Sequence, residues 1–276
     1  MQPTDFDGAL VFIPGGSSGI GLATAKRLVA LGADVALFAR RADVLATAVA
    51  EIEPLRRRAA QRVVAMPLDV GDATQVQAVL TAAIADLGLP AVLINCAGRA
   101  LPDYFERIDA AQFDETLRVN LGGAWHATQV VLPHMRARHR GLIVNVASLA
   151  GLIGLFGYTD YAASKFALVG FSEALRNEVA RDGVRVALLC PPDTQTPGFE
   201  HENRSKPAET HAASAGGSIL TAEQVADELL DGLARRRFLI IPGRQGRFGH
   251  WMKRFFPAIV ARVLDRQVAA VRSTKD

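Results

Sequence analysis

The sequence predicts one α/β domain with a doubly wound parallel sheet of about seven strands and helices on both faces. Three observations carry this prediction. Half of the 276 residues are apolar, which suffices for one well-packed core. Short apolar runs alternate with stretches whose apolar residues recur at helical spacing. A glycine-rich turn separates the first apolar run from the first helical stretch.

Seven short apolar runs are typical of strands that are buried on both faces. They cover residues 9–13, 34–38, 62–68, 91–94, 142–146, 185–189 and 238–241. Helical patterns lie at residues 22–29, from the second strand to about 55, at about 73–87, at about 111–138 with an interruption at Pro133, and around Tyr161. Only residues 200–217, approximately, are compositionally loose.

The glycine-rich turn runs from Pro14 to Gly21. Glycines here permit a tight turn, and they let backbone N–H groups and the positive end of the helix dipole approach a pyrophosphate. Such a cluster can also be only a turn, but its place between strand and helix favours a Rossmann-type dinucleotide site. The candidate residues are Gly15, Ser17, Ser18, Gly19, Ile20 and Gly21.

The end of the second strand indicates which dinucleotide binds. NAD sites usually carry an acid here for the ribose 2′-hydroxyl, whereas an arginine suits the 2′-phosphate of NADP. This strand leads into Arg40 and Arg41 with no acid. We therefore expect NADPH, with Arg40 as the first phosphate contact and Arg41 as the second. The alternative is that both arginines simply begin a solvated helix.

Tyr161 and Lys165 are four residues apart, and Ser148 lies thirteen residues upstream. The spacing places the phenol and the ammonium on one helix face, where the ammonium would lower the phenol pKa. A serine hydroxyl can hold a carbonyl oxygen beside that phenol. The set suits proton transfer at a substrate oxygen while a hydride moves at carbon. Alone, the Tyr-Lys spacing is also typical of a surface tyrosine covered by a lysine.

Composition argues against several other classes of protein, namely disulfide-rich, metal-binding, secreted and membrane-spanning ones. Cys96 and Cys190 end apolar runs, so we expect two small buried residues and neither a disulfide framework nor a metal site. The first residues lack the basic and apolar stretches of a signal peptide, and no apolar run has the length of a membrane span. The expected location is cytoplasmic.

In combination, these residues resemble the short-chain dehydrogenase/reductase family over nearly the whole chain. The matching positions are Gly15, Gly19, Ile20, Gly21, Asp69, residues 95–98, Asn120, Ser148, Tyr161 and Lys165. The resemblance implies that Tyr161 is the general acid in ketone reduction, and that Lys165 lowers its pKa and binds the nicotinamide ribose. It also implies that Ser148 orients the substrate oxygen and that Asn120 supports a proton-relay water.

The same resemblance implies the remaining cofactor contacts. Asp69 would meet the adenine, and Asn95, Ala97 and Gly98 would line the cofactor floor. The set is completed by Val70, Pro191, Thr194 and Thr196. Simpler roles stay open, because Asp69 could cap the helix that begins near residue 72, Asn120 could be a buried amide that bends its helix, and Ser148 could be a loop hydroxyl.

Three positions depart from the usual family pattern. Pro14 stands where a threonine is common, Cys96 where an asparagine is common, and Pro192 where a glycine is common. Pro14 lacks an N–H group and a hydroxyl, so the contacts of the glycine-rich turn with residues 95–98 are expected to differ. None of the three changes removes a catalytic group.

A narrower resemblance covers residues 154–158, 191–200 and 202–207, which look like 3-ketodihydrosphingosine reductases. It implies NADPH-dependent reduction of the long-chain sphingoid ketone 3-oxosphinganine to sphinganine, with Thr196 at the nicotinamide carboxamide. Residues 199–207 would belong to a substrate lid at about 194–220, within a catalytic domain of residues 1–245. The alternatives are a reductase for a 3-oxoacyl thioester, a steroid or a retinoid, or a non-catalytic NADPH-binding protein that interacts with membranes.

The tail at residues 246–276 forms the second unit of the prediction. From residue 235 onward there are eleven Lys and Arg against two acids, a net charge of about +9. Trp251, Phe255 and other large apolar residues recur here at helical spacing, as in a basic amphipathic helix at a membrane surface. Packing on its own domain or on a second subunit is equally expected. Nucleic acid is disfavoured because no recognised binding module is present. The family resemblance implies a homodimer or homotetramer built on the helices that hold Asn120 and Tyr161.

Overall fold

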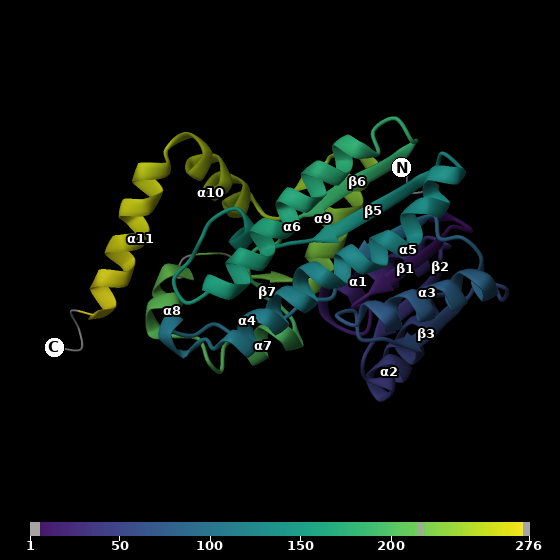
Figure 1. Ribbon diagram of the computed structural model, residues 1–276, viewed down its shortest axis with the longest axis horizontal. Coiled ribbons are helices and arrows are strands. Elements are labelled where there is room, and N and C mark those ends of the chain that lie inside the picture. Colours follow the sequence, from purple (N-terminus) through teal and green to yellow (C-terminus); the bar gives the residue numbers. More distant parts are fainter. Residues whose placement is uncertain (1–5, 215–216, 218, 273–276) are drawn as a thin grey trace.

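The seven predicted strands form one parallel sheet, in the order β3-β2-β1-β4-β5-β6-β9 (Figure 1). The computed structural model describes residues 6–214, 217 and 219–272, so the ends of the expected domain and tail, and residues 215, 216 and 218 of the expected lid, lie outside the described part. The strands are β1 Leu10–Pro14, β2 Asp34–Ala39, β3 Val63–Pro67, β4 Val92–Asn95, β5 Gly141–Val146, β6 Val184–Leu189 and β9 Leu239–Ile240. The order reverses between β1 and β4, and parallel sheets bind ligands at such a switch point.

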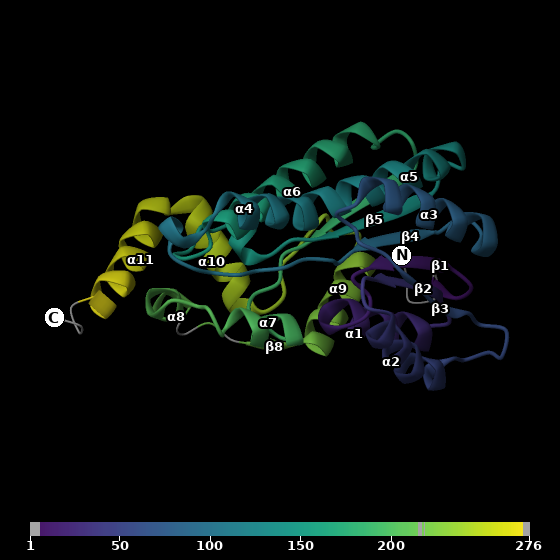
Figure 2. The same cartoon turned by 60° about the horizontal axis from the view of Figure 1, so that its bottom comes forward.

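Both faces of the sheet are covered by helices, as Figure 2 shows. Alternate strand residues point to opposite faces. In β1, Val11 and Ile13 therefore join one core cluster and Leu10 and Phe12 join the other. The first cluster includes side chains of α1 Gly19–Ala30, α2 Ala42–Ile52 and α9 Ala222–Ala234. The second includes side chains of α3 Ala73–Leu87, α5 Gly123–Ala137 and α6 Thr159–Glu178.

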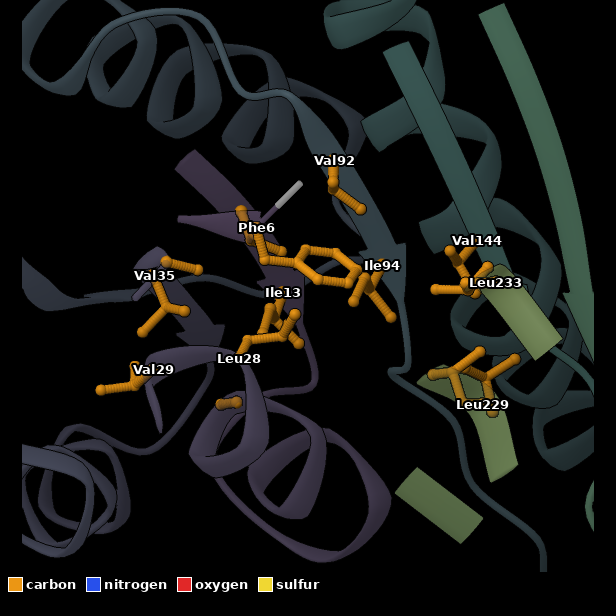
Figure 3. Packing of buried hydrophobic residues seen from close by; sticks show 14 of the residues in the cluster. Phe6, Ile13, Leu28, Val29, Val35, Val92, Ile94, Val144, Leu229 and Leu233 are labelled. Atoms are coloured by element: carbon orange, nitrogen blue, oxygen red, sulfur yellow. The ribbon is translucent and has the colours of Figure 1, made fainter. Parts of the chain in front are cut away.

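Figure 3 shows the first cluster, in which Ile13 of β1 lies near Leu28 of α1 while Leu229 and Leu233 of α9 pack beneath β5. These side chains are at most 4% exposed. Burial on both faces explains why the strands are continuous apolar runs rather than alternating polar and apolar residues.

The expected interruption of the long helix at Pro133 is wrong. Pro133 lies inside α5, and the irregularity comes earlier, where α4 Ala110–Leu117 passes through a π-helical turn at Arg118–Gly122 into α5. A proline near the end of a helix removes only one backbone hydrogen bond. The π-helical turn contains Asn120, whose side chain accepts a hydrogen bond from the Arg99 N–H. Such turns frequently occur at functional sites.

Residues 194–221, which include the loose segment, contain structure that the sequence did not predict. A short parallel ladder joins β7 Thr194–Gln195 to β8 Leu220–Thr221, and two short helices lie between them, α7 Pro197–Glu202 and α8 Ala208–Ser214. Brief 3₁₀ turns occur at Glu53–Leu55, Phe105–Arg107 and Leu149–Gly151.

The tail forms two helices and not the one that the sequence predicted. α10 Arg244–Phe255 and α11 Pro257–Arg272 are separated at Phe256, because a proline disfavours helical backbone in the residue before it. α10 begins against the segments that follow β5 and β9, where Gly246 packs on Leu149 and Ile241. α11 lies beside α8 and projects from the body of the molecule (Figure 1). None of the helices in the described part of the chain is long and apolar enough to span a membrane.

Candidate active site

A cavity of about 570 Å³ opens at the carboxyl ends of the strands. Its walls come from the segments that follow β1, β2, β3, β4, β5 and β6, together with α6, α7 and α8. Most of the expected site residues line it: Gly15, Ser17, Ser18, Gly19, Ile20, Arg40, Arg41, Asp69, Val70, Ala97, Gly98, Ser148, Tyr161, Lys165, Pro191, Thr194 and Thr196. The sheet therefore gathers residues that are up to about 180 positions apart in the chain into one site.

The glycine-rich turn has the shape of a phosphate cradle. Gly15 has a φ of 84°, and a β-carbon there would lie 2.4 Å from the backbone nitrogen of Ala97. Gly19 has a φ of 53°, and its β-carbon would lie 2.9 Å from Thr196. Only glycine allows this approach of three segments without strain. In the described structure Ser18 precedes α1 without a side-chain cap, so the first N–H groups of the helix remain available to an anion.

Gly21 acts from behind the cradle. It is buried and does not appear among the described residues that line the cavity. A β-carbon on Gly21 would lie 2.2 Å from the carbonyl oxygen of Gly15. Gly21 therefore permits the tight turn rather than contacting a ligand directly.

The segments after β2 and β3 form the corner expected to receive the adenosine half of a dinucleotide. Arg40 and Arg41 line the cavity there with exposed side chains. Burial acts to raise the pKa of Asp69, but the Gly71 N–H and the Arg118 guanidinium hold that pKa below its usual range, with a further contribution from Arg40. Asp69 is thus a carboxylate fixed at the corner. The helix cap is Asp72, which accepts a hydrogen bond from the Gln75 N–H at 3.0 Å, so the capping alternative for Asp69 is wrong.

Asn95 does not reach the cavity among the described residues. Its amide donates to Asn145 Oδ1 at 2.8 Å and lies 3.4 Å from Thr128 Oγ1, inside the protein. The expectation that the Asn95 side chain lines the cofactor floor is therefore wrong, because its side chain points from β4 towards β5. The neighbouring Cys96 lines the cavity instead, and its N–H donates to the Pro14 carbonyl at 2.9 Å.

Asn120 holds the π-helical turn to two other segments. Its Oδ1 accepts from the Arg99 N–H at 2.8 Å, and its Nδ2 donates to the Arg99 carbonyl at 3.0 Å and to Ser164 Oγ at 2.9 Å. A β-carbon at Gly98 would lie 3.3 Å from Lys165 Nζ and 3.4 Å from Asn120 Oδ1. Gly98 therefore lies against both the Lys165 ammonium and the Asn120 amide. Asn120 is 1% exposed, and it is not part of the described cavity wall.

Ser148, Tyr161 and Lys165 come together at the end of β5. Ser148 follows that strand, accepts from the Ala150 N–H at 3.1 Å, and hydrogen-bonds the Tyr161 phenol. The Lys165 ammonium lies 5.7 Å from the centre of the Tyr161 ring and donates to the Val146 carbonyl at 2.9 Å. All three side chains line the cavity, which rules out the simpler surface role for the tyrosine.

The pKa of Tyr161 is shifted in the direction opposite to the expectation. Burial raises it, and the Ser148 hydrogen bond only partly opposes that effect. Burial also lowers the pKa of Lys165 to about 8. The lysine donates to a backbone carbonyl instead of the phenol, and its charge does not offset the effect of burial on the phenol pKa. At neutral pH Tyr161 is a neutral phenol and Lys165 still carries its proton, which suits a proton donor beside a cation.

The lid side of the cavity contains residues that sequence patterns did not single out. Tyr158 donates a short hydrogen bond to Glu202, and Glu202 forms a 2.9 Å ion pair with the buried Lys206. Asp193 lines the same wall, four residues beyond the end of β6. Its place after a strand, within the segment 191–200 of the narrower resemblance, was the sequence signal that could have pointed to it.

Comparison with known proteins agrees with this geometry. Residues 9–207 match the short chain dehydrogenase family. A 3-ketodihydrosphingosine reductase from Bos taurus is 39% identical over 246 residues, which is 89% of this chain and 74% of the relative. A 3-dehydrosphinganine reductase from Danio rerio shows the same identity and coverage.

A solved structure of a short chain dehydrogenase/reductase from Burkholderia phymatum, in complex with NAD, superimposes with a TM-score of 0.79 at 28% identity. The match covers 90% of this chain and 94% of that one. With the fold, the cavity and the Ser-Tyr-Lys set in place, the chain belongs to the short-chain dehydrogenase/reductase family and is similar over most of its length to 3-ketodihydrosphingosine reductases.

Proposed function

We propose that the protein reduces 3-oxosphinganine to sphinganine with NADPH. The observation that carries the proposal is the neutral Tyr161 phenol, hydrogen-bonded to Ser148 and adjacent to Lys165 in a cavity built like a dinucleotide site. The similarity to curated 3-ketodihydrosphingosine reductases supplies the substrate.

In this reaction a bound nicotinamide cofactor supplies the hydride that reaches the carbonyl carbon. Ser148 holds the carbonyl oxygen by hydrogen bonding, and Tyr161 donates its phenolic proton to that oxygen. The Lys165 ammonium supplies positive charge as the phenol loses its proton. Asn120 keeps the π-helical turn and α6 in register, so that these groups stay aligned.

Arg40 and Arg41 support the NADPH preference. The sequence offers two guanidinium groups and no acid where β2 ends, and both side chains are exposed at the cavity. A guanidinium can bind a phosphate through two parallel hydrogen bonds, whereas an acidic side chain at the end of β2 would repel it.

The test is a comparison of ketones at fixed NADPH. The proposed enzyme reduces 3-oxosphinganine with a kcat/KM at least about 100-fold above that for a 3-oxoacyl thioester, since the lid would select the sphingoid head. Good turnover of the thioester with none of 3-oxosphinganine would refute the substrate assignment and leave a general ketone reductase. Binding of NADPH with no turnover of either ketone would indicate the non-catalytic alternative.

We further propose that α10 and α11 lie on an anionic membrane surface. Several large apolar side chains of these helices and of the residue between them are at least 43% exposed. They are Phe248, Trp251, Phe255, Phe256, Ile259 and Val263. Lys253, Arg254, Arg262 and Arg266 interleave with them. Such a helix pair combines apolar insertion with attraction to acidic lipid. α11 lies beside α8, whose Ala213 and Ser214 line the cavity, so a membrane here would lie close to the entrance for a lipid substrate.

We also propose that the helices holding Asn120 and Tyr161 pair with a second copy of the chain. Trp125 of α5 and Phe166 of α6 are 47% and 46% exposed on these helices, although each is large and apolar. Light scattering of the purified protein is expected to give a dimer or tetramer mass, and Phe166→Glu is expected to shift it towards the monomer. A monomer mass for the parent protein would contradict this assignment.

A further inference from the structure

Asp193 is a carboxylate in the reaction cavity whose charge has no partner in the described part of the chain. It makes no hydrogen bond or ion pair there through its side chain, while its backbone is held firmly. The Leu220 N–H donates to the Asp193 carbonyl at 3.0 Å, within the ladder between β7 and β8. Two prolines precede it, and Thr194 Oγ1 donates to the Pro192 carbonyl at 2.8 Å.

The other charges on this wall are already matched. Glu202 is paired with Lys206 at 2.9 Å, and the Lys206 side chain is 1% exposed. Glu202 also accepts the hydrogen bond from Tyr158. Arg99, which lines the cavity nearby, lies 3.5 Å from Glu115. Among the described residues, the lid side of the cavity therefore carries one uncompensated negative charge, that of Asp193.

Burial acts against this charge. It raises the pKa of Asp193, while Lys206 and His211 act in the opposite direction from farther away. Asp193 and Glu202 also raise the pKa of Tyr161, so both carboxylates are close enough to influence the phenol electrostatically. A carboxylate that is rigidly held, partly desolvated and unpaired beside the proton donor is suited to receive a cation.

The substrate of the proposed reaction carries such a cation two bonds away from the reacting carbon. In 3-oxosphinganine the amino group is on the carbon next to the ketone, and it is an ammonium at neutral pH. When the carbonyl oxygen lies between Ser148 and Tyr161, that ammonium must lie in the same part of the cavity. We infer that Asp193 binds the ammonium group of the substrate and makes the enzyme selective for α-amino ketones. This inference rests on the proposed function and assigns a specificity residue to the same site.

Asp193 takes no part in the chemical step. Asp193 would act on substrate binding, by matching the ammonium charge, and would leave hydride and proton transfer to the cofactor and Tyr161. The ion pair of Glu202 with Lys206 would keep the remaining wall neutral, so that one ammonium, and not two, is accommodated.

The experiment compares 3-oxosphinganine with 1-hydroxyoctadecan-3-one, which has the same chain, hydroxyl and ketone but no amine. In the parent protein, kcat/KM for the amino ketone is expected to exceed that for the amine-free ketone by on the order of 30- to 100-fold, as for a charge pair in a partly desolvated site. Asp193→Asn keeps the shape of the side chain and is expected to abolish this preference, mainly by raising KM for the amino ketone. The rate with the amine-free ketone is expected to stay within about threefold.

Asp86→Asn is the matched control, because Asp86 is an exposed carboxylate on α3 outside the lid and outside the described cavity wall. It should change neither rate. If Asp193→Asn reduces both ketones equally, or raises KM for NADPH, Asp193 serves the cofactor or the fold and the inference fails. If the parent protein reduces both ketones well but without preference, the inference fails while the reductase function stands. If it reduces neither, the proposed function fails as well.

Discussion

The Lys165 ammonium donates its hydrogen bond to the backbone carbonyl of Val146, at 2.9 Å, and not to the phenol of Tyr161. Val146 is the last residue of β5, so the strand end itself positions the cation. Because the lysine is buried and its hydrogen-bond partner is neutral, its pKa falls to about 8. The charge needed for proton transfer is therefore available at neutral pH and is lost in mildly alkaline solution.

The pH dependence of reduction follows from that lowered pKa. For the free enzyme, kcat/KM with the amine-free ketone is expected to be level near neutrality and to fall about tenfold per pH unit above about 8, as Lys165 loses its proton. The amine-free ketone removes the titration of the substrate from the profile. Lys165→Arg, which keeps its charge, is expected to lose the alkaline limb even if its rate is low. A profile that stays level to about pH 10 in the parent protein would contradict this account.

Arg40 is expected to determine the choice between the two nicotinamide cofactors. Arg40→Ala should lower kcat/KM for NADPH by about 10- to 100-fold and leave that for NADH within about threefold, because only NADPH has the 2′-phosphate. Arg41→Ala is expected to give a smaller effect in the same direction. Steady-state rates with each cofactor measure the ratio. An unchanged NADPH-to-NADH ratio in Arg40→Ala would show that this guanidinium does not bind the phosphate.

Removal of the Asn120 amide is expected to destabilise the protein. Asn120→Ala leaves the Arg99 N–H and carbonyl and the Ser164 hydroxyl without this partner, at a cost of about 2–4 kcal/mol in the free energy of unfolding. Urea denaturation measures that cost. Gln77→Ala is the control, since the Gln77 amide lies on the exposed face of α3 and bonds only to Thr81 in the described structure, and it should cost less than about 0.5 kcal/mol. Equal losses in the free energy of unfolding for the two variants would show that the Asn120 amide does not stabilise the contact with Arg99 and Ser164.

Membrane attachment can be followed with a built-in reporter. The sequence has two tryptophans, Trp125 and Trp251, so Trp125→Phe leaves only the tail residue. Anionic vesicles are expected to shift the Trp251 emission to shorter wavelength, and neutral vesicles are expected to do so much less. Trp251→Glu should abolish sedimentation with anionic vesicles, whereas Leu89→Glu, at an exposed apolar site outside the tail, should not. If neither kind of vesicle changes the emission, the tail instead packs on protein, such as a second copy.

The sequence predicted the sheet well because its strands are buried on both faces. Each strand is a continuous apolar run, and alternate residues such as Val11 and Phe12 join different clusters. The predicted ends of these runs differ from the observed strand ends by at most one residue. The set of Ser148, Tyr161 and Lys165 could also be identified from the sequence, because Tyr161 and Lys165 are spaced to share one face of a helix.

Other features depend on contacts between distant segments. The π-helical turn at Arg118–Gly122 contains Asn120, whose side chain is bound to Arg99 and Ser164, and no local pattern shows those partners. Asn95 stands at the end of a strand, as a cofactor residue would, but its amide donates a hydrogen bond to Asn145 on the neighbouring strand. The raised pKa of Tyr161 required knowledge of its burial and of the carbonyl that captures Lys165.

The two short helices within the predicted lid were missed for a different reason. Residues 197–214 are polar and lack helical periodicity over any useful length, so the sequence suggested only a loose segment. Their order comes from specific pairs, including Glu202 with Lys206 and the Thr210 hydroxyl with the Phe156 carbonyl at 3.0 Å. Pairing of this kind appears only once the chain is folded.

The proton donor is the central claim, and Tyr161→Phe tests it most directly, because the substitution removes one oxygen atom and keeps the ring. NADPH oxidation with 3-oxosphinganine should fall by at least about 1,000-fold, while NADPH binding, measured by its fluorescence, should stay within about twofold. Tyr158→Phe, the neighbouring ring at 5.6 Å, should keep most of the rate. Turnover by Tyr161→Phe within about tenfold of the parent protein would contradict the assignment of Tyr161 as the proton donor.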